Sequence, residues 1–261
     1  MNIAVTSNIA NRIQKIRRGA VYSEWTCFVA ELIQNAQRAK AKNIQIETYS
    51  GYFRIFDDGV GCKNPEEVFT LDFSGWGEDV HSPFGEGFSS TFAIADEIIV
   101  RSETWEARLN VKKSIEENDF NSVEITPVAQ TMGFEVIMYF SDSYNTDKII
   151  TEVKKIGAMI KADITLNNQL ITKKTISYEP FTVRRSLRDF GEAIVAPSED
   201  YAPIEVIYEG RPVTTLYIDG LKGLLALRPG AVTLRAPDRR EIVFDDKRTR
   251  LNQRLRDLSE E

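Results

Sequence analysis

Glu31 and Asn35 are four residues apart in the segment ELIQNAQRA, which has a helical pattern. On a helix, this spacing places both side chains on one face, one turn apart. The amide oxygen of Asn35 is a hard, neutral ligand suited to Mg²⁺, which takes few protein ligands and otherwise binds phosphate oxygens and water. A carboxylate such as Glu31 beside a bound phosphate can accept the proton of an attacking water. Taken alone, however, the pair favours an ordinary solvated helix face.

A second candidate for chemistry is the segment FDDGVG. Asp57 lies at the end of an apolar strand pattern, at a position where a carboxylate does not contribute to packing. Gly59 and Gly61 follow at alternate positions. An aspartate can accept a hydrogen bond from the exocyclic amine of adenine, while glycines let the backbone approach a ring closely. A tight turn capped by an aspartate is the alternative explanation, and it is the better one for this segment in isolation.

The third candidate is a glycine-rich segment that precedes an apolar helical pattern and contains Phe84, Gly85, Glu86, Gly87, Phe88, Ser89 and Ser90. Backbone N–H groups at such a helix start, together with the helix dipole, can face phosphate oxygens, and the serines could add hydroxyl donors. An ordinary glycine-rich helix start would look the same. The chain has no GxxxxGK[ST] sequence and no dinucleotide-binding fingerprint, which disfavours those two nucleotide folds.

Together, the order and separations of these three segments resemble the N, G1 and G2 boxes of the GHKL superfamily, which unites gyrase, the ninety-kilodalton heat-shock chaperone, histidine kinases and MutL. The resemblance covers roughly the first two thirds of the chain and implies a Bergerat-type pocket for ATP and Mg²⁺. It implies that Glu31 is the catalytic base, that Asn35 is the magnesium ligand and that Asp57, rather than Asp58, binds adenine. The implied nucleotide contacts are Asn35, Asp57, Gly59, Gly61, Phe84, Gly85, Glu86, Gly87, Phe88 and Ser89.

The sequence departs from the family at three places. Arg38 stands three residues after Asn35, where relatives usually carry an aspartate, and Ser82 replaces a common glycine before Gly85. Gly133 is followed by phenylalanine instead of threonine, and Thr131 lies two residues earlier. We expect these departures to change affinity and rate more than nucleotide binding itself.

Hydrophobic periodicity predicts the elements that would position these residues. Helices are expected at residues 7–18, 23–41, 87–95 and 146–161, and strands at 44–49, 52–56, 97–102, 106–111, 122–126, 134–140, 163–166 and 170–173. The long segment between Asp57 and Phe84 has six glycines or prolines and no clear period, so residues 62–84 are a candidate lid. Trp76 in this lid could close over a nucleotide or dock a partner, although simple packing explains it better. His81, the only histidine, lies here and outside any helix-pair pattern, which argues against a two-component kinase.

The predicted fold class is α+β: a Bergerat-type sandwich with an antiparallel-rich mixed sheet and helices on one face, followed by a smaller α+β region. We expect an ATP-binding domain at residues 1–173 and a C-terminal, transducer-like region at 174–261, with strands at 204–208, 213–218 and 231–235 and a helix at 247–258. One of the basic residues Arg239, Arg240, Lys247 and Arg248 could reach the γ-phosphate, although a solvated face is the simpler interpretation.

Composition narrows the function classes. The 261 residues carry a formal net charge of −6, which predicts no general field for nucleic acid or for an anionic membrane. Cys27 and Cys62 have neither paired nor metal-ligand spacing and are expected to be reduced thiols. No apolar run approaches the length of a membrane span, so we expect a soluble, cytoplasmic protein without membrane association.

The leading interpretation is a slow ATPase that binds ATP and ADP and uses lid closure to drive a conformational change or a chaperone-like interaction. The alternative is a non-catalytic, ATP-sensing module that stabilises an assembly. Either one implies a protein partner or self-association of unknown identity. A nucleic-acid transaction factor similar to MutL is a third possibility, but the acidic balance counts against it.

Overall fold

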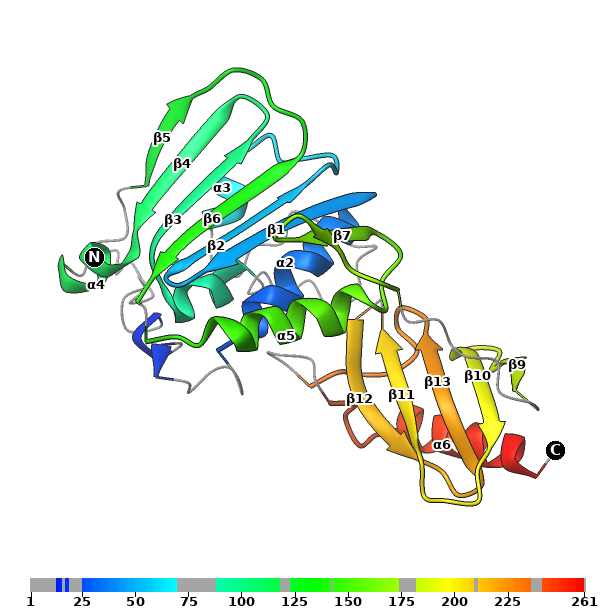
Figure 1. Cartoon of the computed structure of the whole chain (residues 1–261). Coiled ribbons are helices and arrows are strands. Elements are labelled where there is room, and N and C mark those ends of the chain that lie inside the picture. Colours follow the sequence, from blue (N-terminus) through cyan, green and yellow to red (C-terminus); the bar gives the residue numbers. More distant parts are fainter. Residues whose placement is uncertain are drawn as a thin grey trace, which may run out of the picture. The chain divides into compact units, whose positions relative to one another are not determined.

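The computed structural model describes residues 13–15, 17–18, 25–69, 88–117, 123–141, 143–173, 182–208, 211–235 and 241–260 (Figure 1). These residues form two compact units. The first contains the chain up to Lys154 together with Ala162–Ile171, and the second contains Lys155–Lys161 and the chain from Thr172 onward. The predicted division after residue 173 stays a prediction, because part of one helix groups with the second unit and residues 174–181 lie outside the described part.

The first unit is built on an eight-stranded sheet with the order β5-β4-β3-β6-β2-β1-β7-β8. Only β1 and β7 pair in parallel; the other neighbours are antiparallel. This antiparallel-rich mixed sheet with packed helices confirms the predicted α+β sandwich. Its strands are β1 (Asn43–Tyr49), β2 (Tyr52–Asp57), β3 (Ala95–Ser102), β4 (Trp105–Asn110), β5 (Glu124–Pro127), β6 (Phe134–Phe140), β7 (Asp163–Leu166) and β8 (Gln169–Leu170).

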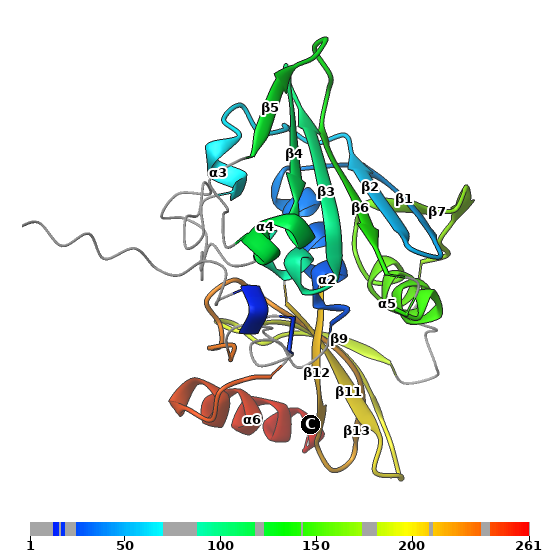
Figure 2. The same cartoon turned by 90° about the vertical axis from the view of Figure 1, so that its left-hand side faces the viewer.

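Two helices, α2 (Cys27–Arg38) and α5 (Thr146–Gly157), lie side by side in both views of the chain (Figures 1 and 2). Phe28 of α2 packs edge-on against Phe53 of β2, with ring centroids 5.1 Å apart. On α5, Ile149, Val153 and Ile156 recur at helical spacing and are all buried. The unit also contains the short helices α3 (Glu66–Phe69), η1 (Phe88–Ala93) and α4 (Val111–Glu117).

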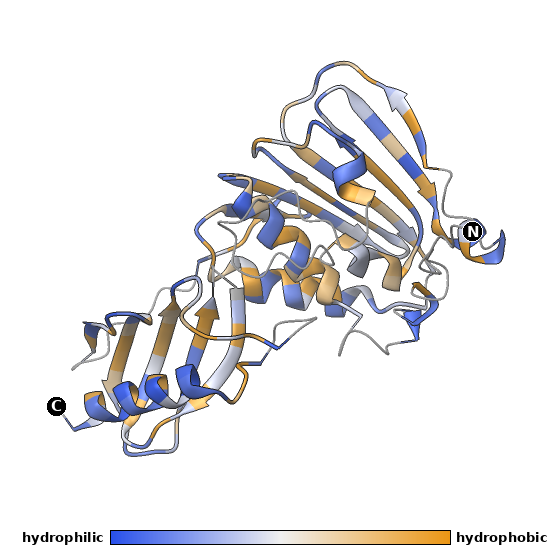
Figure 3. Cartoon of the chain, turned by 180° about the vertical axis from the view of Figure 1, so that it is seen from behind, coloured by the Kyte–Doolittle hydropathy of each residue, from blue (hydrophilic) through white to orange (hydrophobic). Residues whose placement is uncertain are grey.

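The strands alternate buried and exposed residues, which appears in Figure 3 as bands of contrasting hydropathy along the arrows. On the face opposite the buried one, arginines of β2, β3 and β4 each lie between two glutamates, at N–O distances of 2.6–3.6 Å. The residues are Arg54, Arg101 and Arg108 with Glu47, Glu135, Glu106 and Glu97. These charged side chains pair with one another on the side of the sheet away from the core. The alternation of charged and apolar residues therefore fixes which side of each strand faces the core.

The second unit has a five-stranded sheet with the order β12-β11-β13-β10-β9. Its strands are β9 (Val183–Ser186), β10 (Gly191–Pro197), β11 (Pro203–Tyr208), β12 (Arg211–Tyr217) and β13 (Leu221–Leu227). Helix α6 (Asp246–Ser259) covers one face of this sheet (Figure 2) and buries Leu251 and Leu255. Asp245 caps the helix by accepting a hydrogen bond from the Arg248 N–H at 2.9 Å.

Several predicted elements differ from those observed. The expected strand at residues 231–235 is wrong, since that stretch makes only an isolated bridge between Leu234 and Ile242. Strands β9, β10 and β13 were not predicted, because their charges, glycines and mixed polarity hide the two-residue period. The helix expected at 146–161 ends at Gly157. Among the described residues, no helix combines the length and the apolar character that crossing a membrane requires.

Candidate functional site

Helix α2 carries the two residues of the first candidate pair. Glu31 is only 3% exposed, whereas Asn35, one turn further along, is half-buried. Because Glu31 is buried, the solvated-face interpretation does not hold for it, and carboxylates are seldom buried unless they have partners. The helix therefore presents an acidic side chain to the interior of the first unit, one turn from Asn35.

Asp57 ends strand β2 on the face that packs against α2, and it is 5% exposed. Its Oδ1 accepts a hydrogen bond from the Gly59 N–H at 2.9 Å. Burial raises the pKa of Asp57 to about 6; the Gly59 hydrogen bond opposes this effect, and the nearby charge of Asp58 adds to it. A buried carboxyl whose pKa is displaced in this way is a candidate functional group.

The neighbouring Asp58 has a different environment. Its Oδ1 accepts hydrogen bonds from the backbone N–H groups of Lys42 and Asn43 at 2.7 and 2.9 Å, and its Oδ2 accepts one from the Asn43 side chain at 2.7 Å. These bonds, those from Asn43 first, hold the pKa of Asp58 below its ordinary value. Asp58 therefore ties the loop before β1 to the end of β2, and this geometry supports Asp57 as the residue that faces a ligand.

The two glycines of the same segment are required by contacts inside the protein. A Cβ at Gly59 would lie 2.6 Å from the Cβ of Ala39, just beyond α2. Gly61 has a left-handed backbone with a φ of +71°, and a Cβ there would lie 2.8 Å from the Ser102 hydroxyl. The expected reason for these glycines was close approach to a ligand. The structure adds a close approach to α2 and to the end of β3.

The start of β6 lies directly against Asp57. A Cβ at Gly133 would come within 1.9 Å of the Asp57 carbonyl oxygen, so only glycine fits at its φ of +81°. The Thr131 N–H donates to the carbonyl of Glu103 in the β3–β4 turn.

The third candidate segment is only partly described. Phe84, Gly85, Glu86 and Gly87 lie outside the described residues, as do the lid positions Trp76, His81 and Ser82. Phe88 and Ser89 lie in η1, which packs against α2, and Ser89 is 2% exposed. The helix predicted at 87–95 is present over Phe88–Ala93 as a 3₁₀ helix, in which the Thr91 hydroxyl donates to the Phe88 carbonyl at 2.7 Å.

Phe69 and Phe88, the described residues on either side of positions 70–87, contact each other. Their rings lie edge to face with centroids 5.6 Å apart, and α3 packs against η1. Helix η1 in turn packs against α2.

Within the described residues, no group of three or more histidine, cysteine or acidic side chains has metal-binding geometry. A Mg²⁺ ion held here would depend on the amide of Asn35 and on oxygens supplied by a phosphate ligand. The described cysteines, Cys27 and Cys62, are free thiols.

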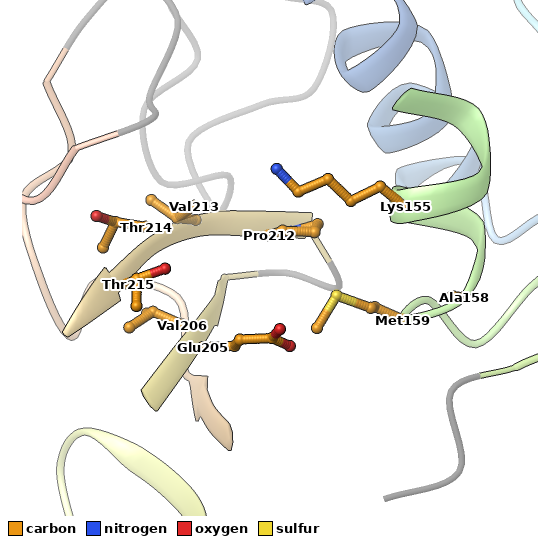
Figure 4. A pocket seen from close by; sticks show the side chains of 9 residues that line it. All are labelled: Lys155, Ala158, Met159, Glu205, Val206, Pro212, Val213, Thr214 and Thr215. Atoms are coloured by element: carbon orange, nitrogen blue, oxygen red, sulfur yellow. The ribbon is translucent and has the colours of Figure 1, made fainter. Parts of the chain in front are cut away.

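The second unit has its own features. A pocket of about 280 Å³ is lined by nine of its residues, including Lys155, Glu205 and Thr214, and by none of the predicted site residues (Figure 4). Of the basic tail, Lys247 donates to the Gly230 carbonyl at 3.0 Å and Arg248 to the Ile242 carbonyl at 2.9 Å. Arg239 and Arg240 lie outside the described residues.

In the first unit, Ser102 and Trp105 contact the segment that follows Asp57, and neither residue was predicted from the sequence. They pair across β3 and β4, and each bonds the backbone of Cys62, just after the glycines. No local signal marks them, because their contact with residue 62 depends on a sheet that forms between distant segments.

Residues 22–142 match the family described as histidine kinase-, DNA gyrase B- and HSP90-like ATPases. The matched range holds α2, η1 and strands β1 to β6, and thus every described residue of the candidate site. No curated protein matches the chain.

Proposed function

We propose that this domain binds Mg-ATP and hydrolyses it slowly, because residues 22–142 match the family of histidine kinase-, DNA gyrase B- and HSP90-like ATPases. The family match supports ATP binding. The roles of individual residues, the turnover and its consequences are parts of the proposal.

The observation that carries the proposal is the buried carboxyl of Asp57. Burial raises its pKa to about 6, so the ionised form is poorly compensated. The exocyclic amine of adenine would supply a hydrogen-bond donor to this carboxylate, and guanine would present a carbonyl there instead. This chemistry favours ATP over GTP.

Catalysis is assigned to α2. Glu31 accepts a proton from the water that attacks the γ-phosphate, a role that contributes about 10²- to 10⁴-fold in rate. Asn35 holds the metal, and a bound Mg²⁺ would neutralise phosphate charge there. The residues present fit such an ion, since a single amide oxygen suits a metal that takes most of its ligands from phosphates and water.

The coupling step is assigned to residues 62–84 and to the glycines that follow them. In the proposal, Gly85 and Gly87 contribute backbone N–H groups to the phosphates, and the lid closes only when the third phosphate is present. Contact between Phe69 and Phe88 supports this idea, because it brings the described residues on either side of positions 70–87 together at η1, which packs against α2. Closure would then drive a conformational change or a partner interaction.

The binding proposal is tested by thermal unfolding with nucleotides. Mg-ATP at 100 times its dissociation constant should stabilise the fold by about 2.7 kcal/mol, and GTP at the same concentration should do much less. If the melting temperature does not change with ATP, or rises equally with GTP, the assignment of Asp57 as the adenine-binding residue is contradicted.

A further inference from the structure

Ser102 and Trp105 lie in the same row of the sheet as Asp57. Asp57 pairs with Phe134, Phe134 pairs with Ser102, and Ser102 pairs with Trp105. Residues directly opposite each other in antiparallel strands point to the same face. Asp57, Ser102 and Trp105 are 5%, 0% and 5% exposed, so all three belong to the buried face.

Both backbone polar groups of Cys62 are held by this pair. The Cys62 N–H donates to Ser102 Oγ at 2.8 Å, and Trp105 Nε1 donates to the Cys62 carbonyl at 2.9 Å. The Ser102 hydroxyl also donates to the Gly133 carbonyl at 2.8 Å. One buried hydroxyl thus joins the loop after Asp57 to the residue that precedes β6.

The loop between Asp57 and Cys62 is fixed at alternate residues. The N–H of Asp58 donates to the Asn43 carbonyl at 3.2 Å, and the N–H of Val60 donates to the Ala39 carbonyl at 3.0 Å. The third attachment is the bond from Cys62 to Ser102. These bonds set the position of Gly59, whose N–H orients the Asp57 carboxylate.

We propose that Ser102 and Trp105 are positioning residues for adenine recognition by Asp57, an inference that rests on the proposed function. They act through the Cys62 backbone and do not bind the nucleotide themselves. Gly133 provides a second route for the same effect. Ser102 bonds the Gly133 carbonyl, and the Gly133 backbone lies so close to the Asp57 carbonyl that a Cβ on Gly133 would come within 1.9 Å of it.

The test measures dissociation constants for Mg-ATP and Mg-GTP in the full chain and in three variants. Ser102→Ala removes the hydroxyl that links Cys62 to Gly133, and Trp105→Phe keeps an aromatic ring but removes the indole donor. The control is Thr48→Val, which removes a buried hydroxyl that bonds the Tyr52 carbonyl at 3.1 Å at the other end of β1. All three variants are first checked for cooperative thermal unfolding.

We expect Ser102→Ala and Trp105→Phe each to weaken ATP binding by about tenfold. Their GTP affinity should stay within about twofold of the parent, because GTP makes no favourable contact with the Asp57 carboxylate. The preference for ATP over GTP should therefore fall about tenfold. Thr48→Val should lower the melting temperature comparably but keep the preference unchanged.

The outcomes are distinguishable. A parent chain that does not bind Mg-ATP contradicts the proposed function. One that binds ATP and GTP equally contradicts the assignment of Asp57, and the positioning role falls with that assignment. If the parent prefers ATP and both variants retain that preference while melting earlier, the two residues are merely structural and the inference is overturned. A loss of preference in Thr48→Val overturns it as well. Should Ser102→Ala fail to fold, Trp105→Phe decides the question alone.

Discussion

Replacing Asp57 by asparagine is expected to stabilise the unliganded chain while it weakens ATP binding. The pKa of about 6 lies roughly 2 pH units above the ordinary value of 3.8, and each unit corresponds to about 1.4 kcal/mol. At pH 7 the ionised Asp57 therefore costs up to about 3 kcal/mol of folding stability. Asparagine removes this cost and can still accept the Gly59 hydrogen bond. Its amide needs a new partner, and a buried donor without one costs about 1–3 kcal/mol, so the expected net gain is at most about 2 kcal/mol.

The gain should depend on pH in a defined direction. An acid whose pKa is raised on folding binds more protons in the folded state between pH 3.8 and about 6. The unfolding free energy of the parent therefore falls as the pH rises through this window, and the contribution stays constant above it. The advantage of Asp57→Asn should be largest at pH 7.5 and nearly absent at pH 4.

Urea unfolding of the parent and the variant at both pH values measures this difference. Asp58→Asn is the matched control, because hydrogen bonds hold the pKa of Asp58 below its ordinary value and the substitution should destabilise the chain at pH 7.5. If Asp57→Asn is less stable than the parent at pH 7.5, or if its advantage does not change with pH, the reasoning from burial is wrong.

The remaining predictions concern turnover, pH and the lid. The affinity of Glu31→Ala for ATP should stay within a few-fold of that of the parent, while its hydrolysis rate in a phosphate-release assay should fall by about 10²-fold or more. An unchanged hydrolysis rate would contradict the assignment of Glu31 as the base and would favour the ATP-sensing alternative. Asn35→Ala should weaken both binding and hydrolysis, and equal affinity with and without Mg²⁺ in the parent contradicts its role as metal ligand. ATP affinity of the parent should fall below about pH 6 as Asp57 takes up its proton, and Asp57→Asn should lack this dependence. Amide exchange across residues 75–83 should be slower with a non-hydrolysable ATP analogue than with ADP; equal protection in the apo, ADP and analogue states rules out nucleotide-driven closure.

The core of the first unit could be predicted because its elements have clear periods. Strand β6 has the predicted bounds, and β1 and β2 extend the predicted ones by one residue each. The helix that carries Glu31 was also predicted, although it is shorter at both ends. In these elements, alternating or helical apolar positions coincide with the buried face, so sequence and tertiary packing agree.

The rest depended on contacts between distant segments. Gly59 is required by Ala39, and Ser102 meets Cys62 only because β3 and β2 both pair with β6. In η1 the Thr91 hydroxyl donates to the Phe88 carbonyl, a side-chain contact with the backbone that a count of apolar positions does not register. Strand β9 has no buried residue, so hydrophobic alternation could not reveal it.

Calorimetric titration of Mg-ATP into the parent chain and into Asp57→Asn measures directly whether the site around Asp57 binds ATP by its adenine. If it does, the parent shows saturable binding of about one nucleotide per chain. The affinity of the variant is then at least about tenfold weaker, even though the variant is the more stable protein. Equal affinity in the two proteins, or no binding to the parent, would show that Asp57 does not bind adenine.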